Sequence, residues 1–214
     1  MRVSILCNNR EHPVVPYLKA WIDSLDTGHN AEFITNIAEA SGGDILFLIS
    51  CSEKVLKKDR DRYRKVLVLH ASDLPAGRGW SPHVWDLLEG ASRITLSLLE
   101  AEDAIDTGKI WKKKIIEIPK HALWDEINNA LFNAEMELLG FAMTEIDYIR
   151  PQEQSASGTP SYRRKRTPDD SRIDPERTIA EQFDLIRLCD PDRFPAHFDH
   201  RGHRYKLRLE KIDE

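Results

Sequence analysis

Cysteine is scarce in this sequence and follows no pattern. Only three cysteines occur among 214 residues. Cys7, Cys51 and Cys189 lie far apart, without the spacing of a zinc site or of a disulfide framework. An odd number of unpatterned cysteines is typical of reduced thiols in a cytosolic protein. The sequence therefore predicts free thiols and no metal site.

Long hydrophobic runs and an excess of positive charge are also missing. No apolar run approaches the roughly 20 residues that a membrane-spanning helix needs, and the N-terminus lacks the apolar stretch of a signal peptide. The formal net charge is −5, whereas nucleic-acid-binding proteins are more often basic. We therefore expect a cytoplasmic protein that acts on a small molecule, with neither nucleic acid nor membrane as partner.

A dinucleotide-binding fingerprint is absent as well. The polar loop Asn8-Asn9-Arg10 follows the first predicted strand, where a Gly-x-Gly-x-x-Gly motif would be expected. Apolar spacing nevertheless predicts alternating elements along the first 150 residues. The predicted strands are 2–7, 31–34, 44–50, 66–70, 93–99 and 109–118, and the predicted helices are 14–25, 82–89 and 122–149. This alternation indicates an α/β fold, Rossmann-like, with a mostly parallel sheet flanked by helices.

Three local patterns refine this prediction. The charged segment 54–65 mixes both signs, which favours a solvated helix or loop over a nucleic-acid patch. The three lysines at 112–114 indicate an exposed edge strand, because charge on an edge prevents unwanted strand pairing. Ser81 is expected to cap a helix that has Pro82 at its first position and ends before Gly90.

The composition changes after residue 150. Residues 151–161 are rich in Gln, Ser, Gly and Pro and are predicted to form a linker between a main unit, 1–150, and a small C-terminal extension, 162–214. In the extension we expect a helix capped by Asp174 and then a β-hairpin over 196–209, with its turn at 199–202. The hairpin could close the sheet edge of its own chain or pair with a second copy, so a homodimer is left open.

Two loops at strand ends carry the polar groups of most interest. One loop holds His70 and Asp73, and the other holds Glu102, Asp103 and Asp106. If the two strands are neighbours, His70 and a carboxylate converge, and a histidine oriented by a carboxylate is a general-base arrangement. On the local pattern alone, a hydrogen-bonded histidine at a strand end fits equally well. No nucleophile elbow is present, so direct transfer is favoured over a covalent acyl-enzyme.

These residues support a resemblance to a known family. The stretch 70–79, His-Ala-Ser-Asp-Leu-Pro-Ala-Gly-Arg-Gly, resembles the His-x-Ser-x-Leu-Pro-x-x-Arg-Gly signature of the formyltetrahydrofolate-dependent formyltransferases. Ile-Asp-Thr-Gly at 105–108 is similar to the family's Asp-x-Gly loop, and the segment 164–174 resembles the start of its C-terminal region. The closest likeness is to the sugar N-formyltransferases. The C-terminal piece is too short for the tRNA-binding barrel of the methionyl-tRNA branch.

The resemblance implies a reaction and roles for two residues. A formyl group would move from N10-formyltetrahydrofolate to the amine of a nucleotide-linked amino sugar, or of a nonulosonic acid precursor, by direct attack and without a metal. His70 would take the amine proton or stabilise the oxyanion, and Asp106 would orient His70. A formyltetrahydrofolate hydrolase and a catalytically inactive folate- or nucleotide-binding relative are the alternatives.

The resemblance also implies binding residues. The folate pocket would be lined by Ser72, Leu74, Pro75, Gly77, Arg78, Gly79, Glu102 and Asp103. Candidates for substrate binding are Arg10, Trp80, Tyr162, Arg163, Arg164 and Arg166, although a solvated basic strip is the alternative for the arginines of the extension.

The sequence departs from the family pattern at one catalytic position. The family usually has an asparagine two residues before the histidine, but Val68 occupies that position here and cannot donate a hydrogen bond. Asn8 and Asn9, at the end of the first strand, are the candidate replacement donors. A second departure is that His70 comes early in the chain, as if one strand–helix unit before it were shortened.

Overall fold

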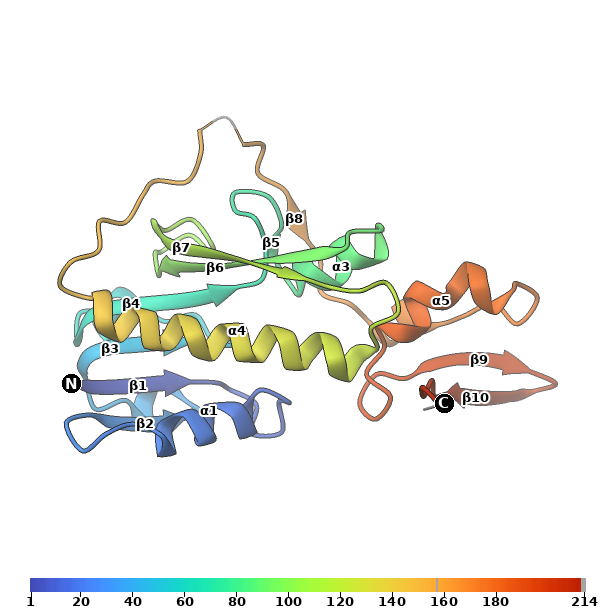
Figure 1. The fold of residues 1–214 in the computed structure, drawn as a ribbon, viewed down its shortest axis with the longest axis horizontal. Helices are drawn as coiled ribbons and strands as arrows, with labels where there is room; N and C mark the ends of the chain where they lie inside the picture. Colours follow the sequence, from blue (N-terminus) through green and yellow to red (C-terminus); the bar gives the residue numbers. More distant parts are fainter. Residues whose placement is uncertain (157, 213–214) are drawn as a thin grey trace.

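A six-stranded sheet forms the centre of the protein in this computed structural model, which describes residues 1–156 and 158–212 (Figure 1). The strand order is β2-β1-β3-β4-β6-β7. The strands are β1 (Arg2–Leu6), β2 (Asn30–Ile34), β3 (Gly43–Leu48), β4 (Tyr63–His70), β6 (Arg93–Glu100) and β7 (Ile110–Glu117). The first four run parallel, whereas β6 is antiparallel to both β4 and β7. The predicted α/β fold with a mostly parallel sheet is confirmed.

Strand β4 lies inside this sheet and ends at His70. Val68 pairs with Leu48 of β3, and His70 lies opposite Ser97 of β6. Because side chains alternate along a strand, Val68 and His70 point to the same face of the sheet. The arrowheads of β1 and β4 in Figure 1 point toward the C-terminal elements, so the carboxyl edge that carries His70 faces them.

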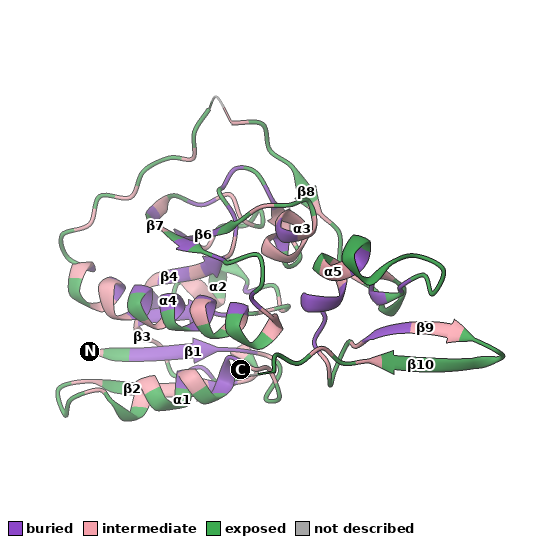
Figure 2. Cartoon of the chain, turned by 45° about the vertical axis from the view of Figure 1, so that its right-hand side comes forward, coloured by how far each residue is buried: buried purple, intermediate pink, exposed green. Residues whose placement is uncertain are grey.

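Helices cover one face of the sheet with a large apolar core. This core joins residues of α1 (Val15–Asp23), α3 (Pro82–Leu88) and α4 (Trp124–Glu145) to the inward-facing residues of the strands. Figure 2 shows buried residues along β1 and on α4. A smaller cluster covers the other face, where the short helix η1 (Ile37–Glu39) and the segment around Val55 pack. Over the described residues, no helix combines the length and the apolar composition that crossing a membrane requires.

Part of the charged segment was assigned wrongly from the sequence. A surface helix, α2 (Lys57–Arg60), is present, but residues 63–65 already belong to β4. Tyr63 is buried, and its hydroxyl group lies 2.7 Å from the hydroxyl of Ser4 on β1. Because Tyr63 is buried, β4 begins within the charged segment, at residues whose polar neighbours predicted a solvent-exposed surface.

The two predicted helix caps were also wrong. Ser81 has a left-handed backbone (φ +45°), and its side chain makes no capping hydrogen bond to α3. Helix α5 (Ile179–Arg187) begins four residues after Pro175, and the hydroxyl of Thr178 accepts the capping bond from the Glu181 N–H at 3.3 Å. Asp174 instead exchanges backbone bonds with the side chain of Gln182. The amide of Gln182 therefore satisfies backbone groups that the predicted first turn would have used.

The predicted hairpin of the C-terminal extension is confirmed. It consists of β9 (Ala196–His200) and β10 (His203–Leu207), joined by Arg201 and Gly202, which both have positive φ. Two consecutive positive φ values are the mark of a type I′ turn, the turn that matches strand twist. Within the described residues the hairpin forms its own two-stranded sheet and does not extend the central one.

A small apolar cluster joins the hairpin to α5. Two short elements precede α5 in the chain, β8 (Tyr162–Arg163) and η2 (Pro168–Ser171). Residue 157 of the predicted linker and residues 213–214 of the predicted extension lie outside the described residues. The division into 1–150, 151–161 and 162–214 stays a prediction. The edge position of the lysine-rich strand is confirmed, because β7 is the last strand of the sheet and Lys112 and Lys113 are exposed.

Candidate active site

His70 and Asp106 meet at the carboxyl edge of the central sheet. Nδ1 of His70 lies 3.6 Å from Oδ1 of Asp106, and both side chains are less than a tenth exposed. β4 delivers the histidine, and the loop after β6 delivers the carboxylate. The convergence holds because β4 and β6 are direct neighbours in the sheet.

The hydrogen bonds of His70 define which ring nitrogen can accept a proton. Nε2 lies 2.8 Å from the carbonyl oxygen of Gly77. A carbonyl oxygen only accepts, so Nε2 carries the hydrogen and donates it. Nδ1 is then the nitrogen with the free lone pair, and it faces Asp106. A histidine with a carboxylate beside one ring nitrogen and a backbone acceptor on the other has the arrangement of a general base.

Asp106 is held on its other side by the glycine loop. Its Oδ2 accepts a hydrogen bond from the backbone N–H of Gly79 at 2.9 Å. The Asp106 backbone is left-handed, with φ of +57°, a conformation that Asp adopts more readily than most residues. The charge is thus fixed between a backbone donor and the imidazole, as a buried carboxylate requires.

Two glycines let the backbones around this pair approach closely. A Cβ added to Gly108 would lie 1.8 Å from the carbonyl oxygen of Glu100, and one added to Gly79 would lie 2.5 Å from that of Arg163. Both neighbours are backbone atoms, which cannot swing aside as a long side chain can. The glycine of the Asp-x-Gly loop is therefore needed to fold the loop back onto the end of β6.

Substituting Gly108 by alanine is expected to destabilise the protein by about 1–3 kcal/mol, the usual cost of forcing extra atoms into a packed region. Urea unfolding followed by fluorescence measures this free energy. Gly140 is the matched control, because a Cβ there meets nothing within 4 Å and the residue lies inside α4. Gly140→Ala should stabilise by roughly 0.5–1 kcal/mol through better helix propensity. Equal stability of the Gly108→Ala protein and the unmodified chain would contradict the close approach.

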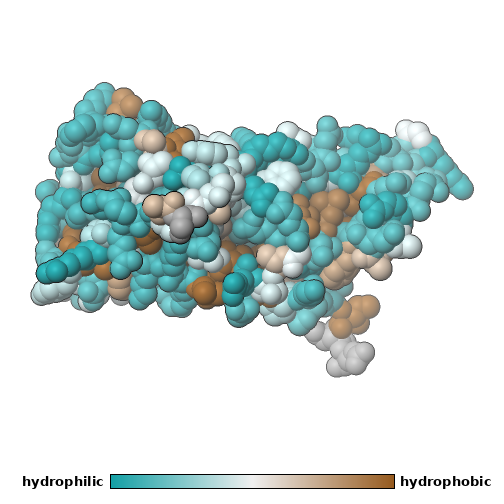
Figure 3. Space-filling view, turned by 90° about the horizontal axis from the view of Figure 1, so that it is seen from above, coloured by the Kyte–Doolittle hydropathy of each residue, from teal (hydrophilic) through white to brown (hydrophobic). Residues whose placement is uncertain are grey.

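The segment predicted to be a linker packs over this site. Gly77 donates its N–H to Oγ of Ser161, and the N–H of Arg78 bonds to the Ser161 carbonyl, both at 2.9 Å. The next residues form a parallel pair, β5 (Arg78–Gly79) with β8. Figure 1 shows the chain passing from the end of α4 over the top of the molecule to β8, and the surface seen from that side is mostly hydrophilic (Figure 3).

One side chain of this segment, Gln154, contacts both loops of the site and was missed in the sequence. Its Nε2 donates to the carbonyl oxygens of Asp106, at 2.8 Å, and Gly108, at 3.1 Å. Its Oε1 accepts from Nη2 of Arg78 at 2.9 Å. The polar composition of 151–161 hid this role, because a Gln in a Ser- and Gly-rich stretch carries no signal of its own.

The residues predicted to line a folate pocket fall into two groups. Ser72, Leu74, Pro75 and Gly77 are buried beside His70, and Arg78 and Gly79 are half-buried at the crossing with β8. Glu102 and Asp103 are exposed, and Asp103 binds Nη2 of Arg60 at 2.6 Å. The structure therefore brings the loop 72–79 to the site and pairs Asp103 with Arg60, whose side chain is only 11% exposed.

A lysine predicted to be a plain edge charge supports the same loop. Nζ of Lys113 lies 2.6 Å from Oδ1 of Asp73 and 2.7 Å from the carbonyl oxygen of Leu74. One of the three edge lysines thus fastens the turn that carries the folate-pocket candidates. Asp73, which was the other carboxylate near His70 in the sequence, is exposed and paired with this lysine rather than with His70.

The predicted substrate arginines are mostly neutralised within the chain. Arg163 pairs with Asp86, at 2.8 Å, and with Glu89. Arg164 binds the Asp170 carboxylate through both terminal nitrogens, and this pairing lowers the pKa of Asp170. Arg166 donates to the carbonyl oxygen of Asp170. Arg163 and Arg164 thus have their charges paired within the chain and hold the extension against α3 and η2, whereas Arg166 has no carboxylate partner among the described residues.

Exposed aromatic rings remain beside them. Trp80 is 44% exposed and Tyr162 is 69% exposed. The guanidinium of Arg78 lies 5.9 Å from the Tyr162 ring, and Nζ of Lys165 lies 4.7 Å from the Trp80 ring. This surface combines flat apolar faces with cations next to the loop 72–79. Arg10, the remaining candidate, is exposed in the loop after β1.

The asparagines expected to replace the missing donor do not fill that role. Both Nδ2 hydrogens of Asn8 have acceptors, the carbonyl oxygen of Thr35 and Oε2 of Glu53. Asn9 is exposed, and its Oδ1 caps the N–H of Glu11. β1 is two strands away from β4, which is about 10 Å at the usual spacing. Asn8 therefore fastens the loops after β2 and β3 and has no N–H left for an oxyanion.

His83 lies within electrostatic range of His70 and of His12. His83, at the start of α3, has its pKa lowered to about 4 by burial and then by the neighbouring charges of His70 and His12. Burial likewise lowers the pKa of His12 to about 4. Both are neutral at pH 7. Of these three histidines, His70 is the one that lies beside a carboxylate, that of Asp106. Their spacing in the sequence gives no sign of this grouping.

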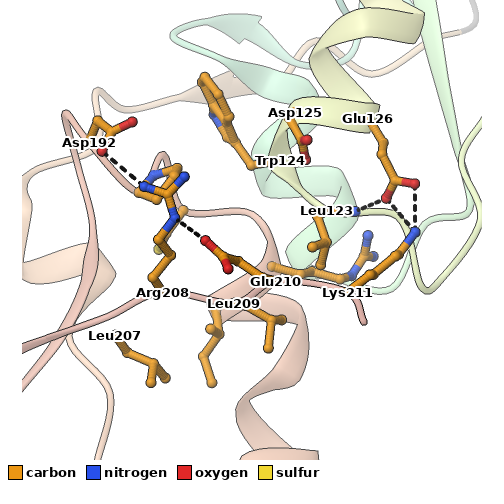
Figure 4. Close-up of a pocket in the computed structure, with 14 residues that line it drawn as sticks. Leu123, Trp124, Asp125, Glu126, Asp192, Leu207, Arg208, Leu209, Glu210 and Lys211 are labelled. Atoms are coloured by element: carbon orange, nitrogen blue, oxygen red, sulfur yellow. Dashed lines mark hydrogen bonds and ion pairs between the residues drawn. The ribbon is translucent and has the colours of Figure 1, made fainter. Parts of the chain in front are cut away.

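A cavity of about 440 Å³ lies elsewhere, between the start of α4 and the end of the chain (Figure 4). Four of its charged groups pair with one another, Lys211 with Glu126 and Arg208 with Glu210. None of the predicted site residues lines it. The cavity therefore does not compete with the His70 site.

The sequence resembles curated methionyl-tRNA formyltransferases, although no family model matches the chain. The enzyme of Rickettsia bellii (strain RML369-C) is 32% identical over 107 residues, which is 50% of this chain and 35% of that protein. The chain thus spans about a third of the length of this relative.

Solved structures with the same fold cover 95–100% of the chain. A methionyl-tRNA formyltransferase from Clostridium thermocellum superposes with a TM-score of 0.81 at 20% identity, covering 100% of this chain and 94% of that one. A 4-N formyltransferase from Francisella tularensis gives 0.72 at 18% identity, with 99% and 98% covered. HypX from Aquifex aeolicus in complex with tetrahydrofolic acid gives 0.74 at 16% identity, with 95% and 36% covered. These comparisons confirm the predicted resemblance to formyltransferases and the fold that it implies.

Proposed function

We propose that this chain is an enzyme that transfers a formyl group from N10-formyltetrahydrofolate to the amine of a nucleotide-linked amino sugar. Likeness in sequence and fold to formyltransferases supports the reaction class. The observation that carries the proposal is the buried pair of His70 and Asp106, 3.6 Å apart at the carboxyl end of a central strand. These two residues come from the two motifs that prompted the resemblance.

In this mechanism His70 moves the proton of the attacking amine. Nδ1 accepts that proton while Nε2 stays bonded to Gly77, and the Asp106 carboxylate stabilises the imidazolium. The same proton then passes to the departing nitrogen of the folate, so His70 returns to its starting state. A positioned general base contributes typically about 10²–10⁴-fold to such a step.

The loop beside His70 fits a polar donor molecule. Oγ of Ser72 and Nε of Arg78 are buried, and neither has a hydrogen-bond partner among the described residues. Groups of this kind are costly unless a ligand or water satisfies them. We place the folate against the loop 72–79, with Ser72 and Arg78 as side-chain donors and the remaining contacts made by backbone groups. The structure of HypX, which contains tetrahydrofolic acid, supports this class of donor.

We place the acceptor on the exposed aromatic surface of Trp80 and Tyr162. A nucleotide base stacks on flat rings of this kind. The likeness to a sugar N-formyltransferase from Shewanella sp., matched over 100% of this chain and 99% of that one, supports a sugar acceptor. The curated relatives are methionyl-tRNA formyltransferases, so methionyl-tRNA is the acceptor to test against.

The experiment is an acceptor panel with N10-formyltetrahydrofolate. UDP- and dTDP-linked amino-deoxyhexoses, a CMP-linked nonulosonic acid precursor and methionyl-tRNA are each incubated with the protein, and tetrahydrofolate release is followed by absorbance. We expect release that depends on one amino sugar. The N-acetylated form of that sugar is the matched control, because it lacks the attacking amine.

The other outcomes separate the alternatives. Transfer to methionyl-tRNA alone would contradict the proposed acceptor. Release without any acceptor would indicate a hydrolase. Measurable folate binding with no release would indicate an inactive relative.

A further inference from the structure

Gln154 is the side chain that ties together the two loops of the active site. It stands in the segment that leaves α4 and passes over the sheet edge toward β8 (Figure 1). The main chain fixes this segment on both sides. Gln152 exchanges two backbone bonds with Ile110, at 2.7 and 2.9 Å, and Ser161 bonds to Gly77 and Arg78. The backbone on both sides of Gln154 is therefore held by hydrogen bonds, which fixes where its amide lies.

The donor half of the amide acts on the loop that carries Asp106. Nε2 donates to the carbonyl oxygens of Asp106 and Gly108, at 2.8 and 3.1 Å. Asp106 has a left-handed backbone, which costs most residues other than glycine about 1–2 kcal/mol and an aspartate less. A conformation of this kind persists only where its surroundings hold it. Gln154 supplies that hold on both sides of Thr107.

The acceptor half of the amide acts on the other loop. Oε1 accepts from Nη2 of Arg78, and the adjacent Gly79 donates its N–H to Oδ2 of Asp106. A closed ring of contacts therefore runs from Gln154 through Arg78 and Gly79 to the Asp106 carboxylate and back through the Asp106 carbonyl. Gln154 thus holds the backbone of Asp106 directly. It holds the side chain of Asp106 indirectly, because Gly79 follows Arg78 in the chain.

We propose that Gln154 is a positioning residue that holds the Asp106 carboxylate beside Nδ1 of His70. Its effect on catalysis rests on the proposed function, because the His70–Asp106 pair is the proposed proton carrier. Gln154 does not contact His70, and it acts through the shape of the loop 105–108. A misplacement of about 1 Å in such a pair can cost on the order of 10²-fold in rate.

The test compares two substitutions that keep the length of the side chain. Gln154→Met removes both halves of the amide, and Gln154→Glu keeps an acceptor for Arg78 while removing the donor to the two carbonyl oxygens. Gln152→Ala is the matched control, since Gln152 is exposed and bonds through its backbone alone in the contacts described. We expect kcat to fall between about 10- and 100-fold in both Gln154 variants. KM for the donor should change much less in Gln154→Glu, which keeps the acceptor for Arg78, and the control should behave as the unmodified protein.

A readout on the free protein separates this inference from the proposed function. The ring nitrogen-15 shifts of His70 report whether Nδ1 faces a carboxylate, and they need no turnover. We expect them to move in both Gln154 variants and to stay in place in Gln152→Ala. If the unmodified protein transfers no formyl group to any acceptor, the proposed function fails while this measurement still tests Gln154.

Three results would overturn the inference. The first is an unchanged His70 spectrum in Gln154→Met. The second is a Gln154→Glu protein with unchanged kcat, because the donor half would then be unnecessary. The third is an equal loss of kcat in Gln152→Ala, because the loss would then not be specific to the side chain of Gln154.

Discussion

Replacing His70 by asparagine is expected to lower the rate of formyl transfer by about 10²–10⁴-fold, the usual contribution of a general base. Asparagine approximates the size of the ring and offers an amide donor, but it cannot accept the amine proton. Asp106→Asn should produce a loss of similar order, because a neutral amide no longer stabilises the imidazolium beside it. Single-turnover kinetics with the acceptor found in the panel measure both effects.

A carboxylate in the same loop supplies the control for this experiment. Asp103 lies three residues before Asp106, but it is exposed and bound to Arg60. Asp103→Asn should therefore leave the rate within about twofold of the unmodified protein, because its carboxylate is 77% exposed and pairs with Arg60 rather than with His70. Donor affinity, measured by fluorescence quenching, should change little in the His70 and Asp106 variants.

The double variant tests whether the two residues act as one unit. Residues that act together lose activity in a strongly non-additive way. The protein with both His70→Asn and Asp106→Asn should be about as slow as the worse single variant. Rates close to those of the unmodified protein in both single variants would reject the assignment of the site. A double variant slowed by the product of the two single effects would reject the coupling between them.

Replacing Glu135 by methionine is expected to make the stability of the protein less dependent on pH. Glu135 lies on α4 with 6% of its surface exposed, and its Oε2 has no hydrogen-bond partner among the described residues. Burial raises the pKa of this carboxyl to about 8. At pH 7 the side chain is therefore protonated in the folded protein and ionised in the unfolded chain.

The sign of the pH effect follows from which state binds the proton. The folded state keeps it up to about pH 8, whereas the unfolded chain releases it near its ordinary pKa of 4.5. Stability from this group is thus fully present below about pH 4.5 and is lost as the pH rises toward 8. Between pH 5 and pH 7 the unmodified protein should lose roughly 2 kcal/mol more unfolding free energy than Glu135→Met.

Urea unfolding at the two pH values measures this difference. Glu135→Gln should remove the same pH dependence, because it cannot ionise, while it keeps the size and polarity of the side chain. Glu137→Gln, two residues further along the same helix, is the exposed control. It should retain the pH dependence of the unmodified protein. A pH profile of Glu135→Met that matches the unmodified protein would contradict the buried neutral carboxyl.

Local periodicity was sufficient to predict most of the fold. The apolar runs ending at Leu48 and His70 are strands buried on both faces, and such runs are recognisable without any tertiary information. The alternation of elements then predicted the α/β fold, and the two family motifs pointed to His70 and Asp106. Errors arose where a distant contact outweighed the local pattern. Tyr63 joined β4 through its contact with Ser4, and Gln182 displaced the expected start of α5.

The predicted binding residues show the same division. The loop 72–79 lies at the site because it is continuous in sequence with His70. The charge of Arg163, in contrast, is taken up by Asp86 and Glu89, more than 70 residues away. A count of basic residues cannot reveal such pairing, and the phosphate-binding role of this strip stays a prediction.

The sequence by itself determined which strands form, the face of β4 on which His70 lies and the glycines that surround it, because these depend on side-chain alternation and on backbone conformations open to glycine. Only the tertiary structure decided that the polar segment after α4 closes over the site and that Gln154 reaches Asp106. The physical reason is that hydrogen bonds of a single polar side chain with residues nearly 50 positions away leave no periodic trace in the sequence. Such contacts exist only after the hydrophobic core has brought the strand ends together.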